Sequence, residues 1–302
     1  MRRQIYWAVC GIAVLAAWGA VLGFGGPGTE PEDKAAREGF GMFSWDEGVL
    51  EPEETQTLSD VAKKADVTTI YQQFSRECLE GEKCGDFVMK MEETGIEVLA
   101  LMGKAEWAYE RDAGTLIEEM RYVAEYNERH RDWGRIQGVM VDVEPYLLDE
   151  WDEGSEKRGE LMAGYVACME RACAYASEKG LKFLVCIPTF YDATNVDILE
   201  RLIAYGCDGV AVMNYNRKDE YGQMAMEAGF AREYEKEIVC VYELQRPGKH
   251  QLEEINTYAN EGLEALRQSA WRLGRQFGYD RLRFAYHYYK PLKELLEKEK
   301  GQ

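Results

Sequence analysis

The sequence predicts a (β/α)8 TIM barrel preceded by an N-terminal hydrophobic segment. Three observations support this fold class. The chain has 302 residues, of which 46% are hydrophobic, and α/β barrels commonly reach this size as a single domain. Short β-branched runs alternate with stretches that could each hold a helix, which is typical of parallel βαβ units. Polar and aromatic residues gather where these runs end, and that end of a barrel carries its functional site.

The first segment, residues 1–24, is predicted to be a signal anchor or a signal peptide. Arg2 and Arg3 precede an apolar stretch, 5–24, that contains no charged residue. Basic residues followed by about 20 apolar residues are typical of an export signal or a membrane anchor. Residues 25–37 are rich in Gly, Pro and charge and are predicted to form a linker. We therefore expect an extracytoplasmic protein that is either anchored to the membrane through this segment or secreted.

The barrel domain is predicted to span residues 38–298. The clearest helix covers 160–179, because apolar residues recur there at helical spacing and Gly180 follows. A second helical pattern covers 249–277. An open doubly wound sheet is the alternative, but no glycine-rich phosphate loop follows an early strand. The eight candidate strands are 39–44, 67–72, 97–102, 138–143, 182–187, 209–213, 237–241 and 283–286.

Charge and composition limit the possible partners. The formal net charge is −19, which argues against nucleic acid and against anionic membrane surfaces as partners. A neutral glycan fits better, although charge alone does not select one. No cofactor or metal is expected, since the chain has only three histidines and none lies near a cysteine pair. Cys78 and Cys84 flank a polar loop, and an exported location would permit a disulfide between them.

The most informative stretch is the fourth predicted strand and its end, 136–146. Asp142 and Glu144 are spaced two residues apart, so on a strand their side chains point the same way. Two carboxyl groups at the end of a buried strand are costly unless they are used or paired. Glu144 lies at the very end, where a substrate could reach it, and the charge of Asp142 could orient a substrate or keep Glu144 protonated. The structural alternative is that both carboxylates cap loop amides or pair with a base such as Lys104.

Aromatic, amide and carboxylate residues follow the other predicted strands. Because the carboxyl ends of parallel strands meet at one face of a barrel, we expect these side chains to surround a single site. Aromatic rings can stack on the apolar faces of sugar rings, and polar groups can bind sugar hydroxyls. The predicted ligand is therefore a carbohydrate, and the predicted binding residues are Trp45, Gln72, Trp107, Tyr146, Asn214, Asn216, Glu243 and His287.

Two of these stretches resemble the motifs of glycoside hydrolase family 18, the chitinase-like enzymes. The fourth-strand signature of that family is Asp-Gly-x-Asp-x-Asp-x-Glu, and Gly138, Asp142 and Glu144 match its Gly, its last Asp and its Glu. The segment 212–216, Val-Met-Asn-Tyr-Asn, is similar to the family's sixth-strand Met-x-Tyr-Asp/Asn motif. The resemblance implies that Glu144 is the general acid. It also implies that Asp142 and Tyr215 position the N-acetyl group of the substrate, whose oxygen is the nucleophile.

This chain departs from the family pattern at three points. Gln137 and Met140 replace the first two aspartates of the signature, and the eighth predicted strand ends in His287 where the family has a tryptophan. A non-catalytic glycan-binding barrel is therefore an alternative. A second alternative is a covalent retaining glycosidase, in which Glu243 is the nucleophile and Glu144 the acid. In that case Glu243 lies about 5 Å from Glu144, whereas a structural role pairs it with a base such as Arg246.

Overall fold

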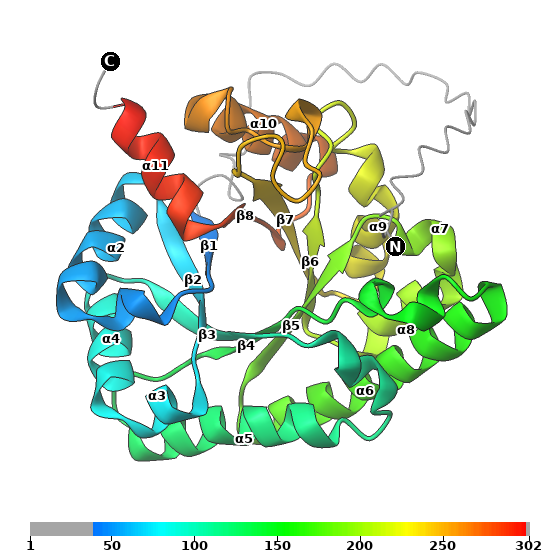
Figure 1. Ribbon diagram of the computed structural model, residues 1–302, viewed down its shortest axis with the longest axis horizontal. Helices are drawn as coiled ribbons and strands as arrows, with labels where there is room; N and C mark the ends of the chain where they lie inside the picture. Colours follow the sequence, from blue (N-terminus) through cyan, green and yellow to red (C-terminus); the bar gives the residue numbers. More distant parts are fainter. Residues whose placement is uncertain (1–38, 300–302) are drawn as a thin grey trace, which may run out of the picture. The chain divides into compact units, whose positions relative to one another are not determined.

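Residues 39–299, the part of the chain described by this computed structural model, form a closed barrel of eight parallel strands (Figure 1). The strands follow one another around the barrel in chain order, and β8 pairs with β1 to close it. The predicted barrel is thereby confirmed, with each predicted strand end within two residues of the observed one. The strands are β1 (Phe40–Ser44), β2 (Val67–Gln73), β3 (Glu97–Met102), β4 (Gly138–Val141), β5 (Lys182–Pro188), β6 (Gly209–Met213), β7 (Glu237–Glu243) and β8 (Leu282–His287).

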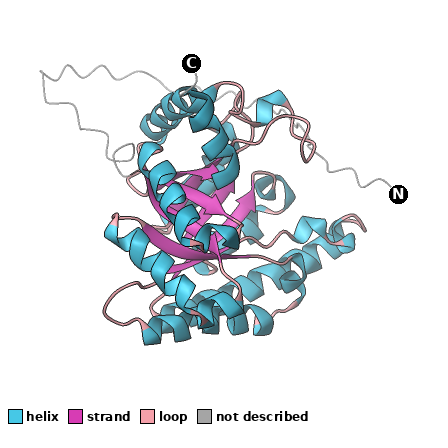
Figure 2. Ribbon diagram, turned by 60° about the vertical axis from the view of Figure 1, so that its left-hand side comes forward, coloured by secondary structure: helices cyan, strands magenta, loops and turns pink. Residues whose placement is uncertain are grey.

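Helices lie around the outside of the strands, which occupy the centre of the molecule (Figure 2). The α-helices are α2 (Pro52–Lys64), α3 (Arg76–Glu80), α4 (Glu82–Glu93), α5 (Gly114–Arg129), α6 (Ser155–Lys179), α7 (Tyr191–Thr194), α8 (Val196–Tyr205), α9 (Ala225–Glu233), α10 (Gly262–Phe277) and α11 (Tyr289–Glu299). Short 3₁₀ helices are η1 (Glu47–Leu50), η2 (Ala105–Tyr109), η3 (Pro145–Leu147), η4 (Asp149–Trp151), η5 (Gly222–Met224) and η6 (Glu254–Asn256).

The two predicted helical patterns have different outcomes. Helix α6 covers the first of them and ends where expected, because Gly180 adopts a left-handed φ of 65° that other residues avoid. The second pattern is α-helical only from Gly262 onward, so the prediction of one long helix was wrong for 249–261, where the only helical turn is the short η6. There the backbone N–H of Tyr258 and the hydroxyl of Thr257 both donate to the carbonyl of Glu243. These bonds attach the segment to the end of β7 and replace helical hydrogen bonds.

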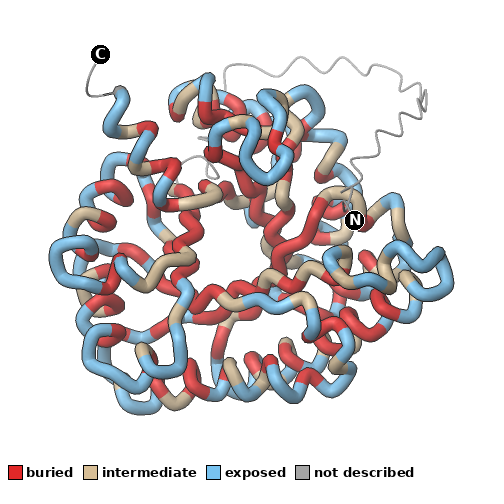
Figure 3. The backbone as a smooth tube through the Cα atoms, in the orientation of Figure 1, coloured by how far each residue is buried: buried red, intermediate tan, exposed pale blue. Residues whose placement is uncertain are grey.

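Alternating strand side chains divide the buried residues into two groups, and buried stretches accordingly follow both the strands and the inward faces of the helices (Figure 3). One group, the outer core, lies between the strands and the helices and includes Ile70, Val139 and Val141. The other group, the inner cluster, fills the inside of the barrel. It consists of Phe43, Tyr71, Leu99, Leu101, Met140, Leu184, Cys186, Ala211, Tyr215, Val239, Val241 and Ala285.

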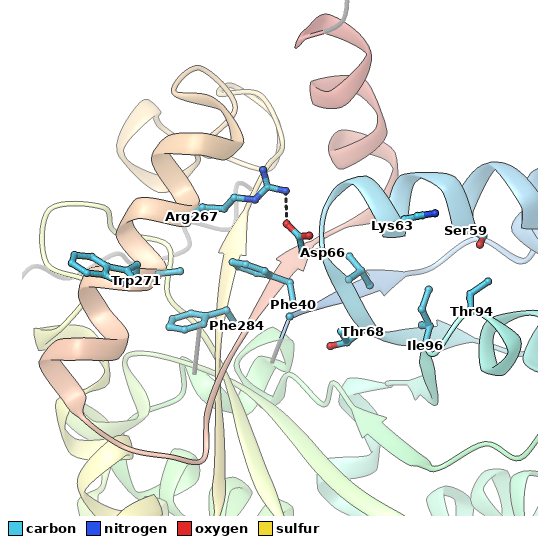
Figure 4. Close-up of a pocket in the computed structure, with 13 residues that line it drawn as sticks. Phe40, Ser59, Lys63, Asp66, Thr68, Thr94, Ile96, Arg267, Trp271 and Phe284 are labelled. Carbon is cyan, nitrogen blue, oxygen red and sulfur yellow. Dashed lines mark ion pairs between the residues drawn. The ribbon is translucent and has the colours of Figure 1, made fainter. Parts of the chain in front are cut away.

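A cavity of about 700 Å³ lies between α10 and α2 at the amino ends of β1, β2 and β8 (Figure 4). Phe40 and Phe284 line it from neighbouring strands, with ring centroids 6.0 Å apart. Arg267 of α10 reaches across to Asp66, at 3.1 Å, and also donates to the carbonyl of Lys64. This cavity is at the opposite end of the barrel from the predicted site residues, so it is separate from the predicted site.

Three further predictions concern the signal segment, the linker and a disulfide between Cys78 and Cys84. The predicted signal segment and linker, 1–24 and 25–37, lie outside the described residues. Between residues 39 and 299, every helix is too short or too polar to cross a membrane. Cys78 and Cys84 are free thiols in the structure. A hydrogen bond from Cys84 lowers the pKa of Cys78, so the two cysteines are neighbours without the disulfide that the sequence permitted.

Candidate functional site

The carboxyl end of the barrel, here called the mouth, carries the predicted carboxylate pair. Strand β4 ends at Val141, yet the alternation continues beyond it because the Asp142 N–H still bonds the carbonyl of Met102, at 2.8 Å. Met140 belongs to the inner cluster, whereas Val141 and Val143 are buried in the outer core. Asp142 and Glu144 therefore point into the mouth, on the same side of the chain as Met140.

Asp142 is held in a largely apolar setting. Met140 lies one step deeper on the same face and is fully buried, and Asp142 Oδ1 is buried without a hydrogen-bond partner among the described residues. Burial, together with the neighbouring charge of Glu144, raises the pKa of Asp142 to about 7, although His287 and the Cys186 thiol act in the opposite direction. Near neutral pH this carboxyl group is therefore partly protonated and can donate as well as accept a hydrogen bond.

Glu144 is contacted by an aromatic group from its own loop. The hydroxyl of Tyr146, at the start of η3, donates to the Glu144 carboxylate. The ring of Tyr146 packs edge-on against Phe190 and Trp151, with centroid distances of 5.3 and 6.2 Å. Packing of this kind fixes the ring and, through it, the position of the carboxylate. Lys104, the base considered as a partner for the pair, instead lies 3.5 Å from Glu119.

Tyr215 reaches the mouth from the segment after β6. It belongs to the inner cluster and is 9% exposed. Its pKa is raised by burial first, and then by the charges of neighbouring groups that include Glu243, Asp142 and Glu144. Its backbone carbonyl accepts a hydrogen bond from Asn256, at 2.6 Å. Tyr215 is thus a fixed, neutral phenol located within the field of all three carboxyl groups.

Glu243 and His287 form a second unit at the mouth, on neighbouring strands. Their strand positions are paired, and His287 Nδ1 lies 2.9 Å from Glu243 Oε2. The other Glu243 oxygen accepts the N–H groups of Leu244 and Gln245, at 2.8 and 2.7 Å. Burial favours a higher pKa for Glu243, but the hydrogen bonds from His287 and Gln245 outweigh it and hold that pKa below the usual value. The basic partner of Glu243 is therefore His287, whereas Arg246 pairs with Glu294.

A cavity of about 480 Å³ opens beside this unit, at the carboxyl ends of β1 and β8. Trp45 and Tyr288 line it and also pack against the inner cluster. Lys290 and Asp46 form an ion pair of 2.7 Å in its wall, and this pair lowers the pKa of Asp46. Aromatic surface next to hydrogen-bonding groups is the combination that we expected for a sugar site.

The structure does not bring three of the predicted binding residues to the mouth. Gln72 is fully buried on the same strand face as Ile70, and it donates to the backbone carbonyls of Asp46 and Gln73. Trp107 is 2% exposed and belongs to the outer core. Asn214 is 2% exposed and donates to the carbonyl of Glu220. All three are buried supports of the fold in this arrangement.

Asn216 has a different position from Asn214. It is half-buried in the turn after Tyr215, and its side-chain oxygen accepts the N–H of Lys218, at 3.2 Å. Its side chain is therefore already used in the turn.

Two residues at the mouth are not among the predicted binding residues. Gln73 follows Tyr71 of the inner cluster by two positions and is exposed at the end of β2, so the alternation of that strand points it, and not Gln72, toward the mouth. Cys186 is a member of the inner cluster on β5, beside the end of β4, and its thiol lowers the pKa of Asp142. The sequence signal for Cys186 was its spacing, because a residue two positions after Leu184 lies on the same face of the strand as Leu184. Among the described residues, no group of three or more His, Cys, Asp or Glu side chains could hold a metal ion.

Comparison with known proteins gives likeness at the level of fold. No protein-family model matches the chain, and no curated protein matches it. A solved structure assigned as an α-L-fucosidase, from Bacteroides thetaiotaomicron, has a TM-score of 0.55 and 9% identity over 94% of this chain and 98% of its own. A structure assigned as a deoxyribose-phosphate aldolase, from Toxoplasma gondii, has a TM-score of 0.53 and 12% identity over 89% of this chain and 94% of its own.

Chitinase barrels are also among the similar structures. One from Bacteroides thetaiotaomicron has a TM-score of 0.46 and 11% identity over 82% of this chain and 89% of its own, which is too distant to carry an argument. Because an aldolase shares the barrel as well as the glycosidases do, these comparisons show the fold alone. The function has to be argued from the site.

Proposed function

We propose that this protein is an exported glycoside hydrolase that cleaves an N-acetylhexosamine-containing glycan by general-acid, substrate-assisted hydrolysis. The observation that carries the proposal is the presence of Asp142, Glu144 and Tyr215 together on the inner face of the mouth. Export is part of the proposal because of the apolar segment 5–24. The aromatic cavity lined by Trp45 and Tyr288 supports a carbohydrate ligand.

The proposed reaction begins with proton transfer from Glu144 to the glycosidic oxygen. The bond from C1 to that oxygen breaks, and the N-acetyl carbonyl oxygen of the same sugar bonds to C1. Asp142 accepts a hydrogen bond from the N–H of that acetamido group, and Tyr215 donates to its oxygen. Water then attacks C1, reopens the ring intermediate and returns a proton to Glu144. Burial and the charge of Glu144 raise the pKa of Asp142 to about 7, so Asp142 keeps a proton at the site in part of the molecules near neutral pH.

The single decisive experiment is Glu144→Gln, assayed on reporter glycosides of N-acetylglucosamine oligomers. Loss of a general acid typically costs about 10²–10⁴ in rate, so turnover should fall by that factor while oligosaccharide binding persists. Glu106→Gln is the matched control, because it changes an exposed carboxylate at the same end of the barrel and should leave turnover unchanged. Equal loss in both variants would contradict the assignment.

A non-catalytic glycan-binding barrel is the second candidate function. Met140 favours it, since this residue is fully buried in the inner cluster at a position where the family signature has a carboxylate. Under this alternative the parent protein binds oligosaccharides and never cleaves them. A measured turnover by the parent, abolished in Glu144→Gln, would exclude it.

The covalent alternative receives less support from the surroundings of Glu243. Its side chain is 2% exposed, and its oxygens already accept hydrogen bonds from His287, Gln245 and Leu244. A nucleophile has to present a free oxygen to the sugar carbon. Trapping with a fluorinated glycoside, followed by peptide mass mapping, would label Glu243 only if it forms a covalent intermediate.

A further inference from the structure

Cys186 lies on the inner face of β5, directly beside the end of β4. The two strands are paired with Val141 opposite Val185, and the next residue on each strand, Asp142 and Cys186, turns into the barrel. Cys186 is 3% exposed and belongs to the inner cluster, as does Met140. The thiol therefore shares the floor of the mouth with the carboxylate pair.

Apolar side chains lie below the Asp142 carboxyl group on the barrel floor. The side chain one step deeper on β4 is the apolar Met140, and the one deeper on β5 is the apolar Leu184. Asp142 Oδ1 has no hydrogen-bond partner among the described residues. Cys186 is the polar neighbour of Asp142 on the adjoining strand, where the pairing of Val141 with Val185 places the two side chains side by side, and the nearby thiol lowers the pKa of Asp142.

We propose that Cys186 is a positioning residue, whose thiol holds the Asp142 carboxyl group in place beside Glu144. As a link in the catalytic cycle this role rests on the proposed function, whereas the contact itself does not. The thiol is a weak donor, so it orients the carboxyl group without holding it permanently ionised. Burial and the neighbouring carboxylates also keep the pKa of Cys186 well above its usual value, so the sulfur stays protonated and remains a donor.

Several other titratable groups face Asp142 and have to be considered in any test. They act through charge or hydrogen bonds from the loop after β4, from helices α6 and α7, from the segment after β6 and from β8. They are Glu144, Tyr146, Tyr165, Tyr191, Tyr215 and His287. A substitution at Cys186 leaves all of them in place, so a change in the titration of Asp142 reports on the thiol.

The test compares Cys186→Ala, which removes the donor, with Cys186→Ser, which keeps one. The carboxyl carbon of Asp142, assigned by comparison with Asp142→Asn, is titrated by ¹³C NMR in each variant. The thiol contact lowers the pKa of Asp142, so Cys186→Ala should raise its titration midpoint, and Cys186→Ser should stay close to the parent. Cys240→Ala is the control, because it removes a buried strand thiol that faces the outer core and should leave the midpoint unchanged.

Turnover provides the second readout. Loss of one hydrogen bond is worth about 1 kcal/mol, so kcat/KM in Cys186→Ala should fall roughly fivefold, mainly through kcat, with recovery in Cys186→Ser. Identical titration and identical kinetics in Cys186→Ala and the parent would overturn the proposal. A parent protein without turnover would refute the proposed function instead, and the NMR titration would still decide the role of the thiol.

Discussion

Asp142 owes its position partly to a glycine on the neighbouring strand end. A Cβ atom added to Gly103 would lie 2.1 Å from the carbonyl oxygen of Asp142, which is far closer than any real contact. The preceding residue, Met102, accepts the N–H of Asp142. Any side chain at position 103 therefore pushes away the backbone that carries the carboxylate pair.

Gly103→Ala should consequently damage both stability and the site. Overpacking of this kind typically costs about 1–3 kcal/mol of unfolding free energy, and displacement of Asp142 should lower oligosaccharide turnover or binding. Urea unfolding and binding measurements check the two effects. Gly229→Ala is the control, because among the described residues nothing lies within 4 Å of a Cβ at that exposed helical position. Unchanged stability in Gly103→Ala would contradict the close approach.

The direction of each side chain decides how well single residues could be predicted. For Asp142 and Glu144 the i, i+2 spacing and the apolar valines between and before them gave the correct face. For Gln72 and Gln73 the sequence has two adjacent amides, and only knowledge of which neighbours fill the barrel selects Gln73. Asn214 was misplaced for the same reason, since it alternates with Tyr215 of the inner cluster. Trp107 was unpredictable by alternation, because it lies on a 3₁₀ helix.

At the scale of elements, helix α6 shows how a glycine inside a helix can serve packing. Gly164 lies where α6 contacts η2, and a Cβ there would come within 2.7 Å of the carbonyl oxygen of Ala108. Gly159 lies on the same helix, and among the described residues nothing is within 4 Å of its potential Cβ. Gly164 and Gly159 therefore have the same helical backbone, but only Gly159 has room for a Cβ atom.

Gly164→Ala and Gly159→Ala should therefore have opposite effects on unfolding free energy. Alanine is favoured over glycine in a helix by about 1 kcal/mol, so Gly159→Ala should stabilise the protein by up to that amount. In Gly164→Ala the clash with the Ala108 carbonyl should outweigh this gain and give a net loss of about 1–2 kcal/mol. Chemical denaturation of both variants measures the difference. If both substitutions stabilise the protein, η2 must move away from the new Cβ atom at position 164 without a loss of unfolding free energy.

The elements that were predicted well are those whose signals are local. Each strand has its own β-branched run, and Gly180 marks the end of α6. The stretch 249–261 was misread because its conformation depends on hydrogen bonds to the carbonyl of Glu243, which is remote in the sequence. Periodicity cannot reveal such a bond, so the pattern of α10 was extended too far toward its amino end.

At the scale of the whole molecule, the order of the strands follows directly from repeated βαβ units, since right-handed crossovers place consecutive parallel strands side by side. The closure of the barrel could be expected from the number of units. Which ionisable groups remain buried in the fold without hydrogen-bond partners could not be expected, because that depends on packing between elements. Glu227 of α9 is such a group: its side chain is fully buried, and both oxygens lack hydrogen-bond partners among the described residues.

Glu227 should make the stability of the whole molecule depend on pH. Burial, helped by the charge of Asp192, raises its pKa from 4.5 to about 8. Between these values the folded state holds a proton that the unfolded chain releases, so this contribution to stability falls as the pH rises from about 4.5 to 8 and is constant above that.

The substitution Glu227→Gln removes this dependence of stability on pH. It should raise the unfolding free energy by at most about 5 kcal/mol near pH 9 and by little near pH 4.5. Urea unfolding across this range measures the effect, with Glu233→Gln, an exposed carboxylate of the same helix, as the control. An equal effect of Glu227→Gln at both ends of the range would mean that Glu227 does not carry the proton in the folded state.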